Sequence, residues 1–431
     1  MSDTLAIMGG EPVLSQPLPP YRSLGERELE MVAQVVRSGC LSGFYGSWCE
    51  EFFGGPLVQR LEQRWARRFG VEYAVSVNSA TSGLFAAMGA IGVGPGDEVI
   101  VPPTTMSATA MAPLVYGALP VFADIEDQTF GLDPQAVRAA LTPRTRAILA
   151  VNLFGHAARL DELMDIAREH DLFLVEDNAQ APLARDQGRY TGTIGHIGVF
   201  SLNYHKHIHT GEGGMCVTND AHLAQRLQLI RNHAENAVAA LKVEDLTNLV
   251  GFNYRLTELQ AAVGLAQLED IDRHVETRVR LAETLSRGTA DLPGIIPPAV
   301  RPGCEHVYYV WAARFQAEVV GVSRELFSRA LAAEGFPHFV GYVEPLYMLP
   351  LFQKRIAMGR DGFPFSLSHR RYPPGLCPVA ERLHRHEFLC FECCPYQVDQ
   401  HLSARLVEAV RKVHARAREL RRWSERREKS S

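Results

Sequence analysis

An aspartate and a lysine follow two neighbouring apolar segments of the sequence. Asp177 comes directly after the apolar run 172–176, and Lys206 follows shortly after Ser201, near the end of the next apolar run. Because parallel strands end at the same edge of a sheet, we expect the carboxylate and the amine to share one rim. Pyridoxal phosphate (PLP) chemistry requires such a pair. The lysine forms a Schiff base with the aldehyde, and the acid keeps the pyridine nitrogen protonated.

The predicted role of Asp177 depends on its charge. A carboxylate about 4 Å from a pyridinium interacts with it by roughly 4 kcal/mol at an effective dielectric of 20. That energy would raise the pKa of the ring nitrogen by about three units. Capping of the following helix is the alternative role for an acidic residue at a strand end. Gln180, one turn further on, and Lys206 favour the cofactor interpretation.

Lys206 must lose a proton before its amine attacks an aldehyde. Burial beside a cationic cofactor favours that loss. The freed amine then carries a proton as a general acid–base. An isolated lysine after a strand would more often lie on the surface, so the assignment depends on the neighbouring Asp177.

The segment Asn78–Leu84 links a predicted strand to a predicted helix and is rich in small residues. Backbone N–H groups at such a helix N-terminus bind phosphate. We expect Thr81 and Ser82 to contact the cofactor phosphate, with the Ser201 hydroxyl on the opposite side. The alternative is an ordinary helix cap.

Short apolar runs alternate with amphipathic segments over the first 245 residues. This alternation predicts an α/β fold with a mostly parallel seven-stranded sheet and helices on both faces. The predicted strands are Tyr73–Val77, Glu98–Val101, Pro120–Ala123, Ala147–Asn152, Leu172–Glu176, Gly198–Leu202 and Gly214–Thr218. The predicted helices include Ser82–Ile91, Leu160–His170 and one long helix, Thr257–Leu285.

The pattern changes after Pro293-Gly294. A strand at Val307–Phe315 and helices at Ser323–Glu334 and His401–Leu420 predict a smaller C-terminal α+β domain. We expect the charged end, 421–431, to fray. The predicted division is an N-terminal segment 1–24, a large PLP-binding domain 25–270 and a small C-terminal domain 271–431.

The composition fits a globular protein. The 431 residues are 46% hydrophobic and 22% charged, with a net charge of −5. That charge argues against nucleic-acid binding, and no apolar run has the length of a membrane span. The start of the sequence does not resemble a secretory signal, and the eight cysteines are scattered, so we expect a cytoplasmic protein with reduced thiols. The group 390–394 contains three of these cysteines, which we interpret as packed thiols because no second pair offers zinc ligands.

These residues together resemble the DegT/StrS family of fold-type I, PLP-dependent sugar aminotransferases. The resemblance extends from Gly9-Gly10 to about residue 415. Gly9–Pro12 and Gly341–Tyr347 resemble a branch that acts on keto-sugars and keto-cyclitols. The other matching segments are Gly94–Pro102, Pro120–Asp124, Glu176–Ala181, Phe200-Ser201 with Lys206, Gly211–Gly214 and Gly251–Glu258.

The resemblance implies an enzyme that moves an amino group from glutamate or glutamine to a keto-sugar or keto-cyclitol. Such a reaction serves amino-sugar, surface-polysaccharide or natural-product biosynthesis. Gln180 would contact the phenolic oxygen of the cofactor. Asn253 would reach the phosphate of the neighbouring subunit's cofactor, which implies a homodimer with shared sites, and Arg255 would lie near the same site. Met106 stands where the family usually stacks an aromatic ring on the cofactor, and a thioether can also cover a ring.

Several alternatives stay open. A sugar dehydratase of this family replaces the lysine with histidine, and a non-catalytic regulator would lack the set Asp177, Gln180, Ser201 and Lys206. The aromatic segment Gly43–Pro56 either lines the substrate or forms a local cluster. The histidines at 205, 207 and 209 alternate as metal ligands can, but we expect no metal because the PLP interpretation already explains the segment.

Overall fold

The computed structural model describes residues 4–428. Its largest sheet has seven strands in the order β1-β9-β8-β5-β4-β2-β3. The strands β3, β2, β4, β5 and β8 are parallel, whereas β9 pairs antiparallel with both β8 and β1. The bounds are β1 (Tyr73–Val77), β2 (Glu98–Val101), β3 (Leu119–Phe122), β4 (Thr145–Val151), β5 (Phe173–Asp177), β8 (Ile197–Ser201) and β9 (Gly214–Thr218). The predicted mostly parallel seven-stranded sheet is confirmed.

Alternating strand residues serve two separate cores, because successive side chains point to opposite faces of a sheet. Val99 and Leu149 pack into one core with helix α3, whereas Ile100 and Ile148 pack into another with helix α6. Since both faces are covered, the strands carry apolar residues in succession.

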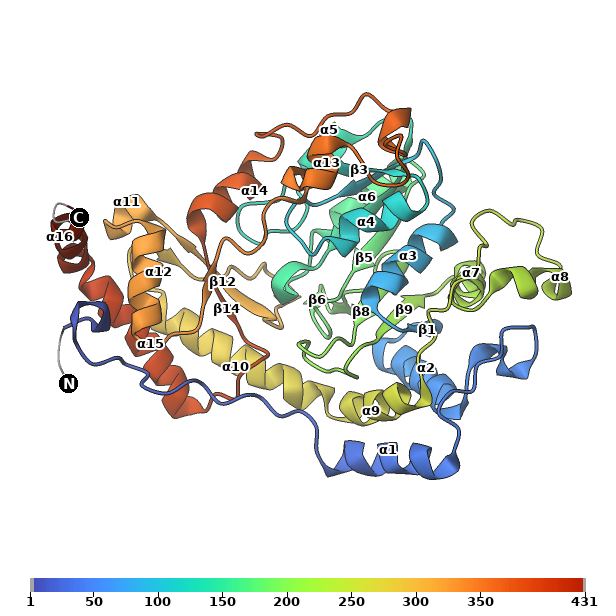
Figure 1. Ribbon diagram of the computed structural model, residues 1–431, viewed down its shortest axis with the longest axis horizontal. Coiled ribbons are helices and arrows are strands. Elements are labelled where there is room, and N and C mark those ends of the chain that lie inside the picture. Colours follow the sequence, from blue (N-terminus) through green and yellow to red (C-terminus); the bar gives the residue numbers. More distant parts are fainter. Residues whose placement is uncertain (1–3, 429–431) are drawn as a thin grey trace.

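The helices of the large domain cover both faces of this sheet (Figure 1). A third core, around Trp65 and Phe200, joins α2 and α9 to β8 and β9. The helices are α1 (Glu26–Ser38), α2 (Pro56–Phe69), α3 (Ala80–Ala90), α4 (Ala108–Val115), α5 (Pro134–Ala140), α6 (Leu160–Glu169), α7 (Ala221–Arg231), α8 (Val238–Leu241) and α9 (Glu258–Glu269).

A four-stranded antiparallel sheet, in the order β10-β12-β14-β13, forms the centre of the smaller C-terminal part. Its strands are β10 (Ile295–Ile296), β12 (Val310–Phe315), β13 (Phe339–Val340) and β14 (Phe388–Glu392). The surrounding helices are α10 (Ile271–Thr289), α11 (Ala317–Val320), α12 (Arg324–Ala333), α15 (Gln400–Ala415) and α16 (Ala417–Glu428). Two further helices of this part of the chain, α13 (Pro350–Lys354) and α14 (Pro378–Arg382), pack instead against the core of the large sheet. A third small sheet joins β6 (Arg185–Asp186), β7 (Arg189–Tyr190) and β11 (Cys304–Glu305).

Helix α10 connects the two parts. Its first half packs Ile271 and Val275 into the core of the large domain, and its second half packs Leu281 and Leu285 into the core of the small one. Because α10 belongs to both cores, it marks no sharp boundary between the two parts. The predicted domain division after residue 270 therefore stays a prediction.

Three predicted helix and strand ends were wrong. The helix Thr257–Leu285 is two helices, since Asp270 leaves helical geometry at φ −105° and ψ 8° between α9 and α10. The strand expected from Val307 begins at Val310, after Tyr308 adopts φ 49°. The helix expected over His401–Leu420 breaks after Ala415.

The expected fraying was also wrong for residues 421–428, because α16 continues to Glu428, while the rest of that expectation, residues 429–431, lies outside the described residues. Leu420 is fully buried, and Trp423 packs against the core of the small domain. On the solvent-exposed face of α16, an ion pair between Arg421 and Glu425, one turn apart, stabilises the helix.

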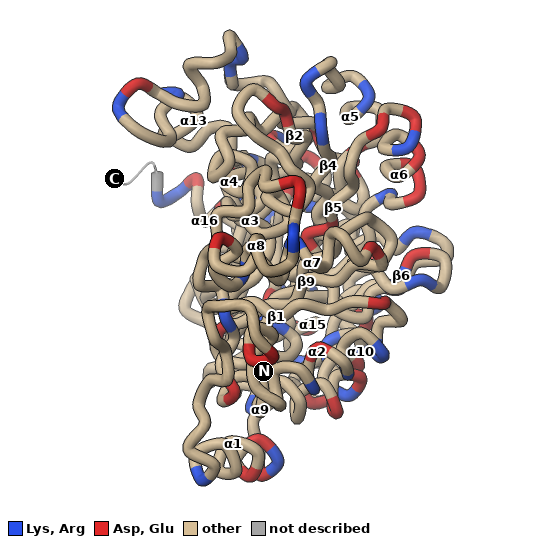
Figure 2. Tube along the Cα trace, turned by 90° about the vertical axis from the view of Figure 1, so that its right-hand side faces the viewer, with Lys and Arg blue, Asp and Glu red and all other residues tan. Residues whose placement is uncertain are grey.

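Charged residues of both signs follow one another along outer helices such as α1 and α6 (Figure 2). Between residues 4 and 428, the structure contains no helix with the length and apolar character of a bilayer span.

Candidate functional site

Asp177 and Lys206 lie at the ends of adjacent parallel strands. Asp177 ends β5, beside β8, and Lys206 lies in the turn that follows β8, with its N–H donating to Asn203 O (2.9 Å). The carboxylate is close enough for its charge to raise the pKa of the Lys206 amine. The structure therefore brings the predicted pair to one rim of the sheet.

Strand alternation gives Asp177 and its neighbour Glu176 different functions. The Glu176 carboxylate accepts backbone N–H bonds from Gly192 (2.6 Å), Ile194 (2.8 Å) and Gly195 (2.7 Å), so it fixes the loop behind the sheet. Asp177 points the other way and accepts a hydrogen bond from the Thr109 hydroxyl (2.8 Å). Only Asp177 therefore faces the predicted cofactor position.

The Asp177 carboxylate is 5% exposed. Burial raises its pKa, while the Thr109 hydroxyl, the Ala179 N–H (3.2 Å) and the charge of Lys206 lower it. A buried carboxylate needs a cationic or donating partner to stay ionised. Thr109 and Ala179 supply part of that stabilisation.

Burial lowers the pKa of Lys206 to about 8, and the charges of Asp177, Cys394 and Glu392 oppose this shift. The Lys206 Nζ lies 4.1 Å from the ring centroid of Tyr309, within the range of a cation–π contact. An amine with this pKa loses its proton near neutral pH more easily than an exposed lysine, as a nucleophile must.

The side-chain amide of Gln180 is held at both ends. Its Oε1 accepts from the Phe154 N–H (2.8 Å), and its Nε2 donates to the Tyr342 hydroxyl (3.0 Å). Phe154 and Tyr342 both have positive φ, at 58° and 56°, and their rings meet edge to face at 4.8 Å. Such backbone strain is typical of functional sites. One N–H of Gln180 is left for a further acceptor.

The segment 78–84 forms the predicted helix N-terminus. Ser79 caps α3, its hydroxyl accepting from the Ser82 N–H (3.0 Å), and the Ser82 hydroxyl donates to Asn78 Oδ1 (2.6 Å). No described residue accepts a hydrogen bond from the N–H groups of Ala80 and Thr81. These two first-turn donors are therefore free for an anion.

Ser201 comes close to this helix N-terminus. It is paired with Gly214 of β9, and a Cβ on Gly214 would lie 2.8 Å from Ala80 N. Glycine thus allows the strand to approach the first turn of α3. The Ser201 hydroxyl accepts a hydrogen bond from the Asn203 N–H (3.3 Å). The structure brings Thr81, Ser82 and Ser201 into one region, and their contacts with phosphate stay a prediction.

Two predicted site residues are exposed in the single chain. The Met106 side chain is 63% exposed, one turn before Thr109 at the start of α4. Asn253 is also exposed, and its backbone oxygen accepts a hydrogen bond from Asn78 Nδ2 (3.4 Å) in the same chain. The predicted contact of Asn253 with a partner's cofactor is not tested by one chain.

The three histidines near Lys206 have separate surroundings. His207 Nε2 lies 2.8 Å from Val307 O, His209 Nε2 lies 2.8 Å from the Ser23 hydroxyl, and His205 faces a pocket beside the lysine. No group of three potential metal ligands occurs within residues 4–428.

The aromatic residues of the segment 43–56 contact one another. The ring centroid of Trp48 lies 5.4 Å from that of Phe52 and 5.5 Å from that of Phe53. The guanidinium carbon of Arg231 lies 4.8 Å from the ring centroid of Phe44. These contacts form a local cluster, and a substrate-lining role stays a prediction.

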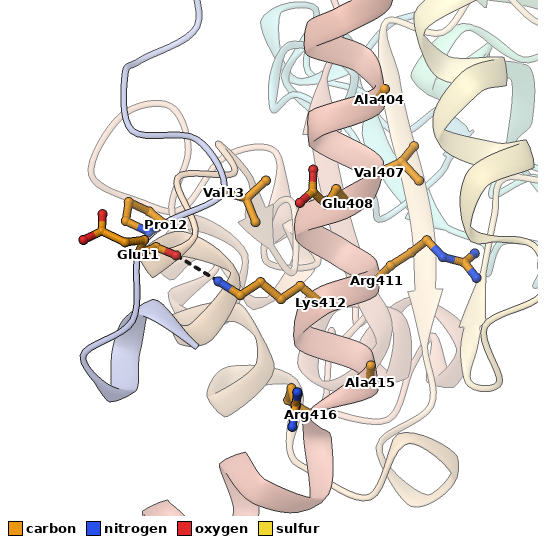
Figure 3. Close-up of a pocket in the computed structure, with 10 residues that line it drawn as sticks. All are labelled: Glu11, Pro12, Val13, Ala404, Val407, Glu408, Arg411, Lys412, Ala415 and Arg416. Atoms are coloured by element: carbon orange, nitrogen blue, oxygen red, sulfur yellow. Dashed lines mark hydrogen bonds between the residues drawn. The ribbon is translucent and has the colours of Figure 1, made fainter. Parts of the chain in front are cut away.

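Lys206 borders a cavity of about 450 Å³ between the turn after β8 and the end of β14. Another hollow, of about 600 Å³, lies between the N-terminal segment and α15 (Figure 3). Its Lys412 reaches the backbone oxygen of Glu11 at 2.9 Å. No predicted site residue lines it, so the cavity at Lys206 is the one relevant to chemistry.

The sequence alone did not predict the supporting roles of Thr109, Tyr309, Phe154 and Tyr342. Thr109 follows Thr105 by one helical turn, and their hydroxyls lie 3.3 Å apart, but nothing in the sequence links this helix to β5. Tyr309 and Tyr342 belong to the small domain, and only the folded chain brings them to Lys206 and Gln180.

A model of the DegT/DnrJ/EryC1/StrS aminotransferase family matches residues 23–370. The chain belongs to this family. It is therefore a PLP-dependent aminotransferase, as the resemblance predicted. Among its relatives in the family is the L-glutamine:2-deoxy-scyllo-inosose aminotransferase of Streptoalloteichus tenebrarius, 36% identical over 88% of this chain and 91% of the relative. Spore coat polysaccharide biosynthesis protein SpsC of Bacillus subtilis is 33% identical over 80% of this chain and 88% of the relative.

Solved structures of related proteins have the same fold. An aminotransferase from Psychrobacter cryohalolentis superposes with a TM-score of 0.81 at 27% identity, covering 93% of this chain and 100% of that one. S. venezuelae DesV in complex with a ketimine intermediate superposes with a TM-score of 0.78 at 31% identity, covering 93% of this chain and 99% of that one. The fold-type I prediction is confirmed.

Proposed function

We propose that this aminotransferase uses PLP, bound at Lys206, to move an amino group from glutamine or glutamate to a keto-sugar or keto-cyclitol. The observation that carries the proposal is the buried pair of Asp177 and Lys206 at adjacent strand ends. Membership of the family indicates the type of reaction, and Asp177 and Lys206 are the residues proposed to carry it out.

The described residues fit PLP. The free N–H groups of Ala80 and Thr81 suit a phosphate, with the Ser82 and Ser201 hydroxyls nearby. The Asp177 carboxylate suits a protonated ring nitrogen, and the remaining Gln180 N–H suits a phenolic oxygen. Met106 stands at the position expected to cover the ring. When bound, PLP supplies the aldehyde that binds amines and the ring that accepts electrons from Cα.

Lys206 has two functions in this proposal. Its amine, whose pKa is about 8, would hold the cofactor covalently. The same amine, when free, would move a proton to and from the substrate carbon as general acid–base. Asp177, which accepts hydrogen bonds from Thr109 and Ala179, would hold the ring-nitrogen proton.

The substrate class is supported by the relatives. The names of several curated relatives specify glutamine and inosose ketones, and GDP-perosamine synthase of Caulobacter vibrioides is 36% identical over 69% of this chain and 78% of the relative. Keto-cyclitols and keto-sugars both carry a ketone on a hydroxylated ring. No observation favours the dehydratase alternative, because the buried amine beside Asp177 is Lys206.

We also propose a homodimer in which Asn253 of each chain reaches the partner's cofactor phosphate. Its exposed side chain and the exposed Met106 support an incomplete site in one chain. The eight free cysteines support a cytoplasmic location, where thiols stay reduced.

Amino transfer tests the function. The purified enzyme, with PLP and glutamine or glutamate labelled with 15N at the α-amino group, would be offered 2-deoxy-scyllo-inosose and a nucleotide-linked 4-keto-sugar. We expect mass spectrometry to find the 15N amino group on one ring, and no product with Lys206→Ala. Absence of amino transfer to either class of ketone, from an enzyme that holds PLP, would contradict the proposal.

A further inference from the structure

The cavity beside Lys206 is lined by one carboxylate, that of Glu392, which the proposed chemistry does not use. The cavity, of about 450 Å³, lies between the turn after β8, the N-terminal segment and the end of β14. Its lining includes Glu392, the last residue of β14, together with Tyr204, His205 and Arg278. Lys206 opens into the same space, so a molecule in the cavity can approach the reacting amine.

Glu392 is a carboxylate without a partner. None of the residues between 4 and 428 donates a hydrogen bond to its side chain or forms an ion pair with it. Its partial burial raises its pKa, and the charge of Lys206 opposes that shift. Burying a carboxylate without donors costs free energy. An unsatisfied group of this kind, at the mouth of a reactive lysine, is typical of a residue that binds a ligand.

Arg278 lines the same cavity but makes no hydrogen bond or ion pair with Glu392 among the described residues. Its guanidinium lies 3.6 Å from the ring centroid of Tyr21, and its two terminal nitrogens donate to the backbone oxygens of His274 (2.8 Å) and Cys394 (3.2 Å). The Nε of Arg278 has no partner within the described residues. The Ser23 hydroxyl is engaged by His209 (2.8 Å). The acceptor capacity of Glu392 is therefore left for a bound molecule.

We propose that this cavity holds the hydroxylated ring of the amino acceptor, and that Glu392 accepts hydrogen bonds from its ring hydroxyls. The proposal rests on the proposed function and adds a residue that selects the substrate. Hydroxyl groups donate well to a carboxylate, whereas a phosphate or a second carboxylate would be repelled. The ring is therefore expected to enter with its uncharged, hydroxyl-bearing side toward β14, and any phosphorylated part would lie outside this cavity.

Two variants of Glu392 distinguish hydroxyl binding from a general effect of charge. Glu392→Gln keeps an acceptor oxygen and the side-chain shape, whereas Glu392→Ala removes both. Removing a hydrogen bond to a charged group lowers the affinity by about 10- to 100-fold. We expect the loss with Ala, and only a few-fold loss with Gln. Glu318→Gln, which removes an exposed carboxylate of the same domain, is the matched control.

The experiment is a titration of the PLP-loaded dimer with 2-deoxy-scyllo-inosamine and with a nucleotide-linked 4-amino-sugar, followed by the cofactor's absorbance. The half-reaction with L-glutamine is measured on the same variants. We expect the dissociation constant of the ring ligand to rise in the order wild type, Gln, Ala, while the dissociation constant of glutamine stays within about threefold. Glutamine carries its own carboxylate and gains nothing from Glu392.

The thermal stability of the same proteins, measured without ring ligand, gives a second readout. Because Glu392 has no partner in the protein, we expect both variants to keep or raise the melting temperature. A large fall would show a structural role and would overturn the proposal.

The other outcomes separate this inference from the proposed function. Equal dissociation constants for wild type and Glu392→Ala, or equal losses for the ring and for glutamine, would overturn the inference alone. A loss with Gln as large as with Ala would show that charge, rather than hydroxyl donation, decides binding, and would also overturn it. Wild-type enzyme that transaminates glutamine but binds neither ring would contradict both proposals.

Discussion

Replacing Thr109 with valine tests whether this hydroxyl keeps Asp177 ionised. Valine has nearly the same shape but removes the 2.8 Å hydrogen bond to the buried carboxylate. A hydrogen bond to a charged group contributes about 1.5–3 kcal/mol. At 1.36 kcal/mol per unit, its loss would raise the pKa of Asp177 by about one to two units. The Ala179 N–H, at 3.2 Å, would be the remaining donor to this carboxylate.

The expected kinetic result follows from that shift. Activity needs the ionised carboxylate, so a raised pKa moves the acid limb of the pH–rate profile to higher pH. We expect a shift of about one to two units, and therefore a fall in the glutamine half-reaction rate of about 10- to 100-fold on the acid limb. The assay is stopped-flow absorbance of the PLP enzyme with L-glutamine between pH 5.5 and 9.

Thr109→Ser is the matched control, because it keeps the hydroxyl and loses only a methyl group. We expect it to retain the acid limb of the wild type. A valine variant with the rate and acid limb of the wild type would refute the role of Thr109. A serine variant as impaired as valine would show that the methyl packing, rather than the hydrogen bond, matters.

Three further predictions concern the paired residues. Asp177→Asn should lower turnover by about 100-fold or more, with a smaller effect on PLP retention. The reason is that a neutral amide lacks the attraction of roughly 4 kcal/mol between the carboxylate and the protonated ring. Near-native turnover would show that Asp177 acts only as a helix cap. Mixing Lys206→Ala and Asn253→Ala subunits should restore activity above both parents, since a shared-site dimer then has one site without lesions; no recovery despite proven subunit exchange would place Asn253 outside the partner's site. The pKa of Lys206, about 8 in the folded chain against 10.5 for an ordinary lysine, means that the folded state binds fewer protons between these values. The unfolding free energy of PLP-stripped enzyme should therefore rise with pH across this window, by up to about 3 kcal/mol. Unfolding by denaturant at pH 7.5 and at pH 10 measures this rise, and the variant Lys206→Met should not show it.

The sheet was predictable because its strands carry local information. The apolar runs around Val99 and Val175 are bounded by turn residues, and the observed strands begin and end within two residues of the predicted ones. Asp177 and Lys206 could be placed on one rim because parallel strands fix which ends meet. Asp270 shows the limit of periodicity, since the apolar pattern continues through a residue where the backbone turns between two helices.

The support of the site was not predictable in the same way. The contacts of Tyr309 with Lys206 and of Tyr342 with Gln180 join residues more than a hundred positions apart, and they depend on how the small domain packs on the large one. The unpartnered state of Glu392 is likewise a property of the folded cavity. The sequence shows a glutamate between cysteines, and only the three-dimensional surroundings show that no donor reaches it.

The most direct test of the account is the site of covalent PLP attachment. The holoenzyme would be reduced with borohydride, digested and mapped by mass spectrometry, with Lys206→Ala as the control. We predict one pyridoxyl group per chain, on the peptide that contains Lys206, and no labelled peptide in the variant. A pyridoxyl group on any other lysine of the wild-type enzyme would contradict the assignment.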